Sequence, residues 1–236
     1  MNAFGSALPQ WQIDASRFAV LSRLADDLAH EIKNPLNSMV INLEVLKSRV
    51  EKGAADAALE RAAVIEHEIR RLHTLIESLL RLLRPARERE AAISVSRVLE
   101  ELLPLIELRV RLARLEFSAR SLAVDAFTAV PADSLRFSLL LVAERVLDVA
   151  RGTNAAMWLT ADPTPGEILL RVGCSGGGAT LISATVLSGE ESGSFPGISA
   201  ATALLEAAGG SVEVDDTAQA GAGPAVLLRL PRAQFI

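Results

Sequence analysis

One short stretch of the sequence has residue types and a spacing that could carry out chemistry. It holds His30, Glu31 and Asn34, and Pro35 follows directly. An imidazole has an unperturbed pKa of about 6.5, so a neutral nucleophilic nitrogen is available near neutral pH. A neighbouring carboxylate can hold the other ring nitrogen and accept a proton from it. An amide one helical turn further on can orient a water molecule or an incoming group. The stretch therefore predicts a nucleophilic histidine with a base beside it.

The stretch lies on a helix predicted over residues 14–51, where apolar residues recur at steps of three and four. A helical wheel places Leu28, Ile32 and Met39 toward a core. The opposite, polar face holds His30 together with Arg23, Asp26, Asp27, Lys33, Asn34 and Asn37. An exposed position argues against a structural core histidine.

Pro35 interrupts the pattern of this helix one turn after His30. A proline removes one backbone hydrogen bond and crowds the carbonyl of Glu31, which costs about 3 kcal/mol in an isolated helix. A costly kink at this place favours a functional role, and a plain break into two shorter helices is the alternative. The other histidines, His67 and His73, lie among charged residues, where solvated side chains are expected and a zinc site is not.

A second helix is predicted over residues 56–84. Its apolar residues alternate steps of four and three, which is a heptad seam, at Ile65, Ile69, Leu72, Ile76, Leu79 and Leu83. Two helices cannot cover so wide an apolar stripe by themselves. Pairing two such hairpins into a four-helix bundle would bury it, so a homodimer is expected. The alternative is a hairpin that packs on the rest of its own chain.

The remainder of the chain mixes helices with short strands, and the composition changes near Arg84 and Pro85. The sequence predicts helices over 96–114, 133–151 (capped by Asp133) and 198–208. It predicts strands over 115–118, 122–124, 156–160, 168–173, 211–215 and 225–230. The expected fold class is therefore α+β, with helices over one mostly antiparallel sheet. The expected domains are a helical hairpin, 14–84, and an α+β domain, 91–236.

Composition excludes several classes of protein. The 236 residues are 50% hydrophobic and carry a net charge of -5, which argues against disorder and against nucleic-acid binding. A single cysteine cannot form an internal disulfide or a cysteine-based zinc site. No apolar run reaches about 18 residues, and the first residues lack the pattern of a secretory signal. The expectation is a cytoplasmic protein with no membrane span.

The stretch from His30 to Leu36, on a long amphipathic helix followed by a heptad helix, resembles the dimerisation and histidine-phosphotransfer domain of bacterial two-component sensor histidine kinases. The resemblance covers residues 14–84 and continues more faintly through that family's ATP-binding domain. It implies that His30 accepts a phosphoryl group, assisted by Glu31 and Asn34. It also implies response-regulator receiver domains as partners, which dock beside His30 on the exposed residues Asn37, Ile41 and Glu44.

The sequence departs from this family where the family binds ATP. The best register puts Leu141 and Arg145 at two asparagine positions that hold Mg²⁺, and neither side chain is a cation ligand. A slip of one residue would put Glu144 there instead. Cys174 takes the place of an aspartate that recognises adenine, and a thiol is a weak acceptor. The glycine-rich lid keeps only Gly193 and Gly197.

The expected function is that of a homodimeric histidine phosphotransferase, which passes phosphoryl groups between receiver aspartates through His30 without ATP, another cofactor or a metal. One alternative is a histidine autokinase with a diverged ATP site. Another is a non-catalytic pseudokinase adaptor that docks receivers. A plain coiled-coil protein would leave His30 and Glu31 beside Pro35 unexplained.

Overall fold

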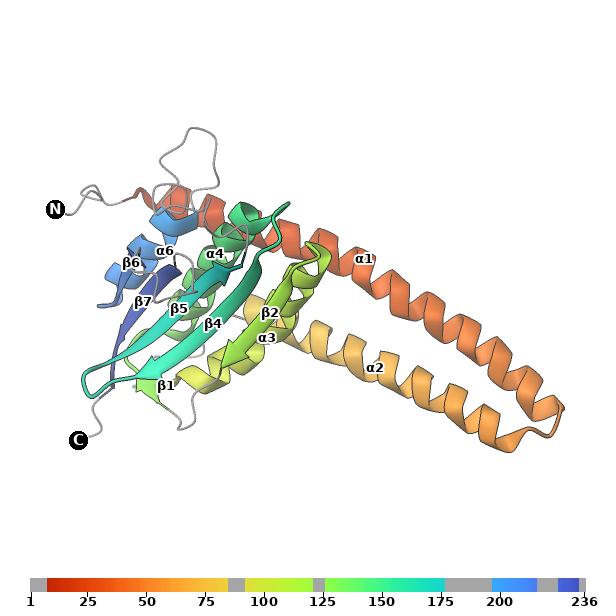
Figure 1. Cartoon of the computed structure of the whole chain (residues 1–236). Coiled ribbons are helices and arrows are strands. Elements are labelled where there is room, and N and C mark those ends of the chain that lie inside the picture. The colour runs from red at the N-terminus through yellow and green to blue at the C-terminus, as the bar shows by residue number, and fades with distance from the viewer. Residues whose placement is uncertain (1–7, 85–91, 121–125, 177–196, 216–224, 234–236) are drawn as a thin grey trace.

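The computed structural model describes residues 8–84, 92–120, 126–176, 197–215 and 225–233. A long helical hairpin packs at one end against a helix-over-sheet domain, which confirms the α+β prediction (Figure 1). The hairpin consists of α1 (Gln10–Glu51) and α2 (Ala55–Leu83). They are joined at Gly53, whose φ of +68° favours glycine. None of the described helices combines the length and the apolar character that a membrane crossing needs.

The first helix starts earlier than the sequence predicts, and Pro35 does not break it. It begins at Gln10, with Pro9 as its N-cap, rather than at residue 14. It continues across Pro35 as one helix of 42 residues, so the alternative of two shorter helices is wrong. The ring of Pro35 is buried, and this packing offsets the lost backbone hydrogen bond.

The helix-over-sheet domain has one five-stranded sheet in the order β2-β4-β5-β7-β6. Only β2 and β4 run parallel, so the prediction of a mostly antiparallel sheet is confirmed. Its strands are β2 (Glu116–Arg120), β4 (Ala156–Pro163), β5 (Glu167–Ser175), β6 (Ser211–Asp215) and β7 (Ala225–Pro231). A separate short pair joins β1 (Ile93–Ser94) to β3 (Phe127–Thr128). The strand predicted over 122–124 lies outside the described residues.

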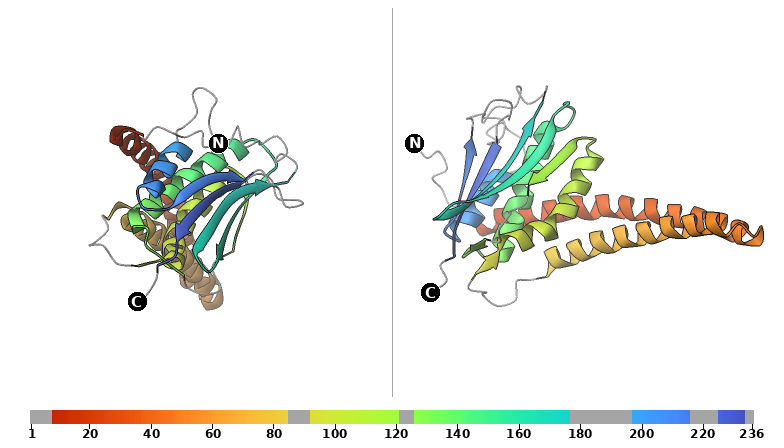
Figure 2. Two further views of the ribbon diagram at one scale, coloured as in Figure 1. Left: turned by 90° about the vertical axis from the view of Figure 1, so that its left-hand side faces the viewer. Right: turned by 60° about the horizontal axis from the view of Figure 1, so that its bottom comes forward.

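Three helices form a layer on one face of this sheet: α3 (Val95–Leu112), α4 (Ala132–Ala150) and α6 (Gly197–Glu206) (Figure 2). The N-terminal half of α1 crosses the other side of this layer. Helix α4 is therefore enclosed, and every residue from Ser138 to Leu147 is buried. A helix that is apolar on most of its circumference can be stable only in such a central position.

Local contacts define where these helices begin and end. Ser94 caps α3, because its hydroxyl accepts from the backbone N–H of Arg97 at 3.2 Å. The predicted cap of α4 by Asp133 is wrong: Pro131 is the N-cap, and Asp133 lies in the first turn, where it pairs with Arg136. At Gly210, after α6, a Cβ atom would lie 2.7 Å from the carbonyl of Arg229, so only glycine fits.

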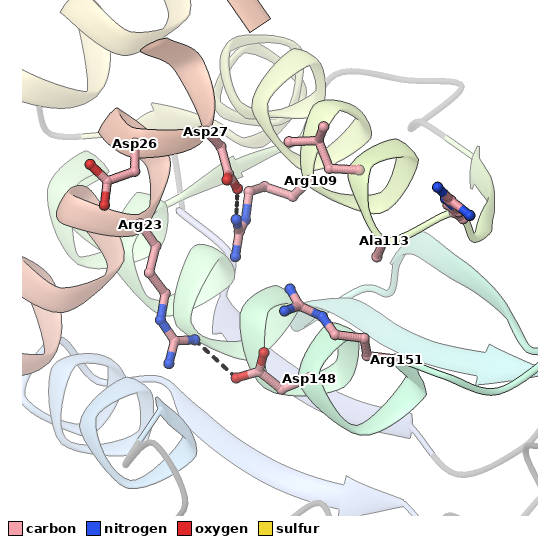
Figure 3. A pocket seen from close by; sticks show the side chains of 9 residues that line it. Arg23, Asp26, Asp27, Arg109, Ala113, Asp148 and Arg151 are labelled. Carbon is pink, nitrogen blue, oxygen red and sulfur yellow. Dashed lines mark hydrogen bonds and ion pairs between the residues drawn. The ribbon is translucent and has the colours of Figure 1, made fainter. Parts of the chain in front are cut away.

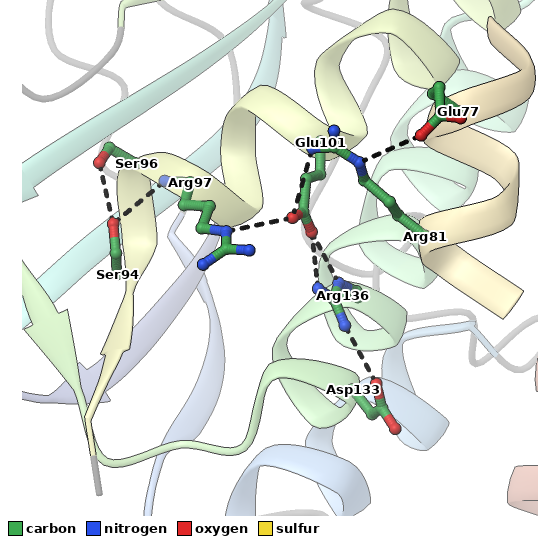
Figure 4. A network of polar contacts seen from close by, with 8 residues as sticks. All are labelled: Glu77, Arg81, Ser94, Ser96, Arg97, Glu101, Asp133 and Arg136. Carbon is green, nitrogen blue, oxygen red and sulfur yellow. Dashed lines mark hydrogen bonds and ion pairs between the residues drawn. The ribbon is translucent and has the colours of Figure 1, made fainter. Parts of the chain in front are cut away.

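A buried carboxylate fastens the end of α2 to the domain (Figure 4). Glu101 on α3 accepts two hydrogen bonds from Arg136 of α4, at 3.1 and 2.6 Å. Arg81 of α2 and Arg97 of α3 approach the other oxygen of Glu101, at 3.7 and 3.5 Å. This cluster therefore ties the end of α2 to the α+β domain. Part of the hairpin surface packs on its own chain, as the alternative to a dimer expected.

Candidate functional site

His30 lies on the exposed side of α1, as the helical wheel predicted. Its ring makes no hydrogen bond to any residue that the structure describes. Lys33, Asn34 and Asn37 are exposed as well, while Leu28 is buried and faces the core. The imidazole can therefore be reached from solvent by a large partner.

Glu31 is buried, although it is adjacent to the exposed His30. Its Oε2 atom accepts a hydrogen bond from Arg71 of α2 at 2.8 Å and another from Arg111 of α3 at 3.0 Å. Its Oε1 atom lies 3.5 Å from the amide nitrogen of Asn34. The expectation that Glu31 holds a ring nitrogen of His30 is not met in this conformation. Two guanidinium donors in a partly buried place bind the carboxylate instead.

Two residues expected on a solvated face instead bind the α+β domain (Figure 3). Arg23 donates to Asp148 of α4 at 3.0 Å, and Asp27 pairs with Arg109 of α3. Together with Glu31, these residues are spaced by four along α1 and so lie on one face. We call the three the ion-pair ladder. Sequence analysis did not predict the ladder, because its partners in the α+β domain are 80 or more positions away.

A cleft of about 560 Å³ opens beside the ladder, between α1 and the C-terminal ends of α3 and α4. Its lining is mixed in charge and consists of Arg23, Asp26, Asp27, Arg109, Leu112, Ala113, Arg114, Asp148 and Arg151. Arg23 and Arg109 point their guanidinium groups at carboxylates across it (Figure 3). Acidic and basic groups therefore largely neutralise one another here.

The residues expected to dock a receiver lie further along α1. Asn37, Ile41 and Glu44 are all exposed, and Glu44 forms only a local ion pair with Lys47 at 3.0 Å. Ile41 has 64% of its surface exposed. The α+β domain packs against the opposite end of α1, so this surface is open to a partner (Figure 1).

The groups at the expected nucleotide positions do not fit ATP and Mg²⁺. Leu141 is fully buried and Arg145 is nearly so. Glu144, the residue reached by a slip in register, accepts two hydrogen bonds of 2.6 Å from Arg109. Its oxygens are therefore already used in a bidentate ion pair, and a cation would have to displace a guanidinium group.

Cys174 on β5 is also unsuited to its expected role, the recognition of adenine. It is fully buried, and burial raises the pKa of its thiol to about 11. A protonated thiol is a weak hydrogen-bonding group. The glycines at 177–178 and 193 lie outside the described residues, and Gly197 begins α6. Within the described ranges, no three His, Cys, Asp or Glu side chains are grouped to hold a metal ion.

Comparison with known protein families finds a match for the hairpin. Residues 20–88 match the model of the His Kinase A (phospho-acceptor) domain. This range contains His30, the whole of α2 and most of α1. No curated protein sequence matches the chain.

Several solved structures of histidine kinases are similar to the chain at low sequence identity. The histidine kinase AdeS of Acinetobacter baumannii is 14% identical, with a TM-score of 0.45 over 87% of this chain and 98% of that one. The mycobacterial sensor histidine kinase MprB is 17% identical, with a TM-score of 0.44 over 61% and 99%. Full-length ShkA in complex with AMPPNP is 22% identical, with a TM-score of 0.44; the match covers 91% of this chain but 46% of ShkA.

The hairpin that matches this domain model is followed in the chain by a helix-over-sheet domain. Residues 20–88 are therefore similar to the His Kinase A phospho-acceptor domain.

Proposed function

We propose that this protein is a histidine phosphotransferase of a two-component phosphorelay, in which His30 carries phosphoryl groups between receiver aspartates. The observation that supports this most is a contrast between the two domains. The hairpin presents an exposed histidine in a phospho-acceptor domain. In the α+β domain, the positions that would bind adenine and Mg²⁺ hold Cys174, Leu141 and Arg145, all buried. Phosphoryl groups would then have to come from another protein rather than from ATP.

The transfer step needs only groups that the chain and a receiver supply. A neutral ring nitrogen of His30 attacks the phosphorus of a receiver's aspartyl phosphate. A nitrogen–phosphorus bond forms, the acyl oxygen–phosphorus bond breaks, and the receiver's carboxylate leaves. The proton on the other ring nitrogen is held or taken by Glu31, which removes the positive charge from the phosphorylated ring. The reverse sequence delivers the group to a second receiver.

Asn34 and the surface beyond it complete the proposed site. Asn34 would orient a water molecule or the incoming aspartate. A receiver would lay an amphipathic helix along Asn37, Ile41 and Glu44, where the exposed Ile41 supplies an apolar contact. These residues lie on the part of α1 that the α+β domain leaves uncovered.

The active form would be a homodimer through the hairpin, residues 14–84, with the α+β domain over 91–236. Large apolar side chains remain exposed along the whole of α1, at Trp11, Phe18, Leu36, Val40, Leu43 and Val50. On α2 they lie at Ile69, Ile76, Leu80 and Leu83. A second copy that covers these stripes would complete a four-helix bundle.

The test is labelling by a phosphorylated receiver domain. His30→Ala should abolish incorporation of acid-labile phosphate with little loss of stability, because Ala is favourable at an exposed helix position. His67→Ala and His73→Ala are matched controls on exposed positions of α2, and both should label normally. Labelling retained by His30→Ala would overturn the assignment. Receiver binding without labelling of the unaltered protein would favour the non-catalytic adaptor.

A further inference from the structure

The ion-pair ladder ends on the residue that the proposed transfer step uses as its base. Glu31 is held from two directions, by Arg71 within the hairpin and by Arg111 of the α+β domain. The Arg111 contact joins residues 80 positions apart in the chain. The side chain of Arg111 therefore brings a contact of the α+β domain into the phosphoacceptor motif.

Both carboxylate oxygens of Glu31 are engaged in this arrangement. Oε2 accepts from the two guanidinium groups, and Oε1 faces the amide of Asn34. His30 and Glu31 are adjacent on the helix, so their side chains leave it in different directions. Glu31 can serve His30 only after it turns out of this ion-pair cluster.

The two arginines are not equivalent. The side chain of Arg71 is 31% exposed and also approaches Glu68 at 3.6 Å, so it belongs to the hairpin's own packing. The side chain of Arg111 is 54% exposed and lies in the last turn of α3. Exchange of Arg111 therefore disturbs little besides Glu31. The other ladder pairs, and the buried Glu101 cluster at the end of α2, keep the two domains together when Arg111 is replaced.

We propose that Arg111 is a positioning residue through which the α+β domain restrains Glu31 and so sets the nucleophilicity of His30. While Arg111 is bound, Glu31 stays in the cluster and the imidazole is without its base. When the contact with Arg111 is lost, only Arg71 still binds Oε2, so Glu31 turns out of the cluster more readily and accepts a hydrogen bond from the ring. This inference builds on the proposed role of His30, but it predicts a property of the ring that exists without any receiver.

The experiment therefore measures the reactivity of His30 directly. The full chain is treated with diethylpyrocarbonate, which acylates neutral imidazole nitrogens, and the rate at each histidine is followed by mass spectrometry. His67 and His73 are exposed on α2 and serve as internal references. Arg111→Gln should raise the rate at His30, relative to these two, by about two- to fivefold, the range expected for loss of a partly exposed ion pair.

Three further variants separate positioning from a general effect. Arg114→Gln removes a positive charge just beyond the same helix and should leave the rate unchanged. Arg111→Lys should restore much of the restraint. Arg111→Gln in a Glu31→Gln background should have no effect, because the group that is released is then absent.

Each outcome decides the proposal. Equal rates for Arg111→Gln and Arg114→Gln would overturn it, as would an effect of Arg111→Gln that persists without the Glu31 carboxylate. If His30 reacts as described but never takes phosphate from a receiver, the proposed phosphotransfer fails while the restraint by Arg111 stands.

Discussion

For single residues, the sequence predicts the position of His30 on the helix but not the partners of Glu31. The exposure of His30 followed from helical spacing alone. The burial of Glu31 did not, because Arg71 and Arg111 come from two other helices. No periodicity within α1 indicates which distant arginine will face a given carboxylate. Charged residues spaced by four on one face, at 23, 27 and 31, were the available signal of a docking surface.

Replacement of Glu31 by Gln should affect both transfer and stability. Loss of a general base is expected to slow phosphoryl transfer by about 10²-fold or more. Loss of the charge that two arginines bind should also lower the free energy of unfolding by about 1–3 kcal/mol. Single-turnover labelling and thermal unfolding measure the two effects. Asn34→Ala is the matched control, and it should mainly change the loss of phosphoryl to water. Wild-type transfer rates in Glu31→Gln would contradict the role of the carboxylate.

Cys174 makes a separate prediction about alkaline stability. Burial raises the pKa of its thiol from 9.0 to about 11 in the folded state. Below pH 9 both states are protonated, so stability is unaffected. Between pH 9 and 11 the unfolded chain loses this proton and the folded chain does not, which lowers the free energy of unfolding by about 2 kcal/mol.

The measurement for Cys174 is urea unfolding at several pH values, compared with Cys174→Ala. The variant starts from a lower stability but should lack this part of the alkaline loss. Parallel pH profiles for the two proteins would show that the thiol is not held protonated in the folded state.

At the scale of elements, the helices and strands were largely predictable from period and turn residues. The hairpin, the order of the strands in the chain and the glycine stop at residues 209–210 appear where the sequence indicated them. The start of α1 was placed too late, and Asp133 was wrongly made a cap. Both errors concern helix ends, where a proline before the helix competes with ordinary capping residues.

Which face of each hairpin helix meets which partner depends on tertiary packing. Leu72 is buried within the hairpin, whereas Ile76, four residues later, keeps 42% of its surface exposed. The heptad seam of α2 is therefore buried only in part within this chain, and the proposed dimer would cover the remainder. A single amphipathic pattern cannot distinguish these two kinds of burial.

This division predicts different results from charges placed on the two helices. Ile76→Asp should put an unpaired charge in the proposed dimer interface, so the protein should become monomeric while it stays helical. Ile41→Asp is the matched control on exposed surface of α1, and it should remain dimeric but bind receivers more weakly. Light scattering at low micromolar concentration and circular dichroism measure both. A dimeric Ile76→Asp protein would contradict the four-helix bundle.

For the whole molecule, the two domains differ in how their polar groups are arranged. The α+β domain has a five-stranded sheet, the central helix α4 and a close backbone approach at Gly210 that only glycine permits. Its polar groups near the nucleotide positions are instead used in pairs such as Arg109 with Glu144. The scaffold could be predicted because core packing tolerates many sequences. The ion pairs that join charged residues of this domain to α1 could not be predicted, because they depend on how the two domains pack together.

In the proposed function, His30 receives phosphoryl groups from receiver domains and not from ATP. A direct test exposes the unaltered protein to two labelled donors in parallel, a phosphorylated receiver domain and ATP with Mg²⁺. Acid-labile phosphate is then mapped by mass spectrometry. We expect rapid labelling at His30 from the receiver and none from ATP. Labelling of His30 by ATP at a comparable rate would contradict it and identify the protein as a histidine autokinase.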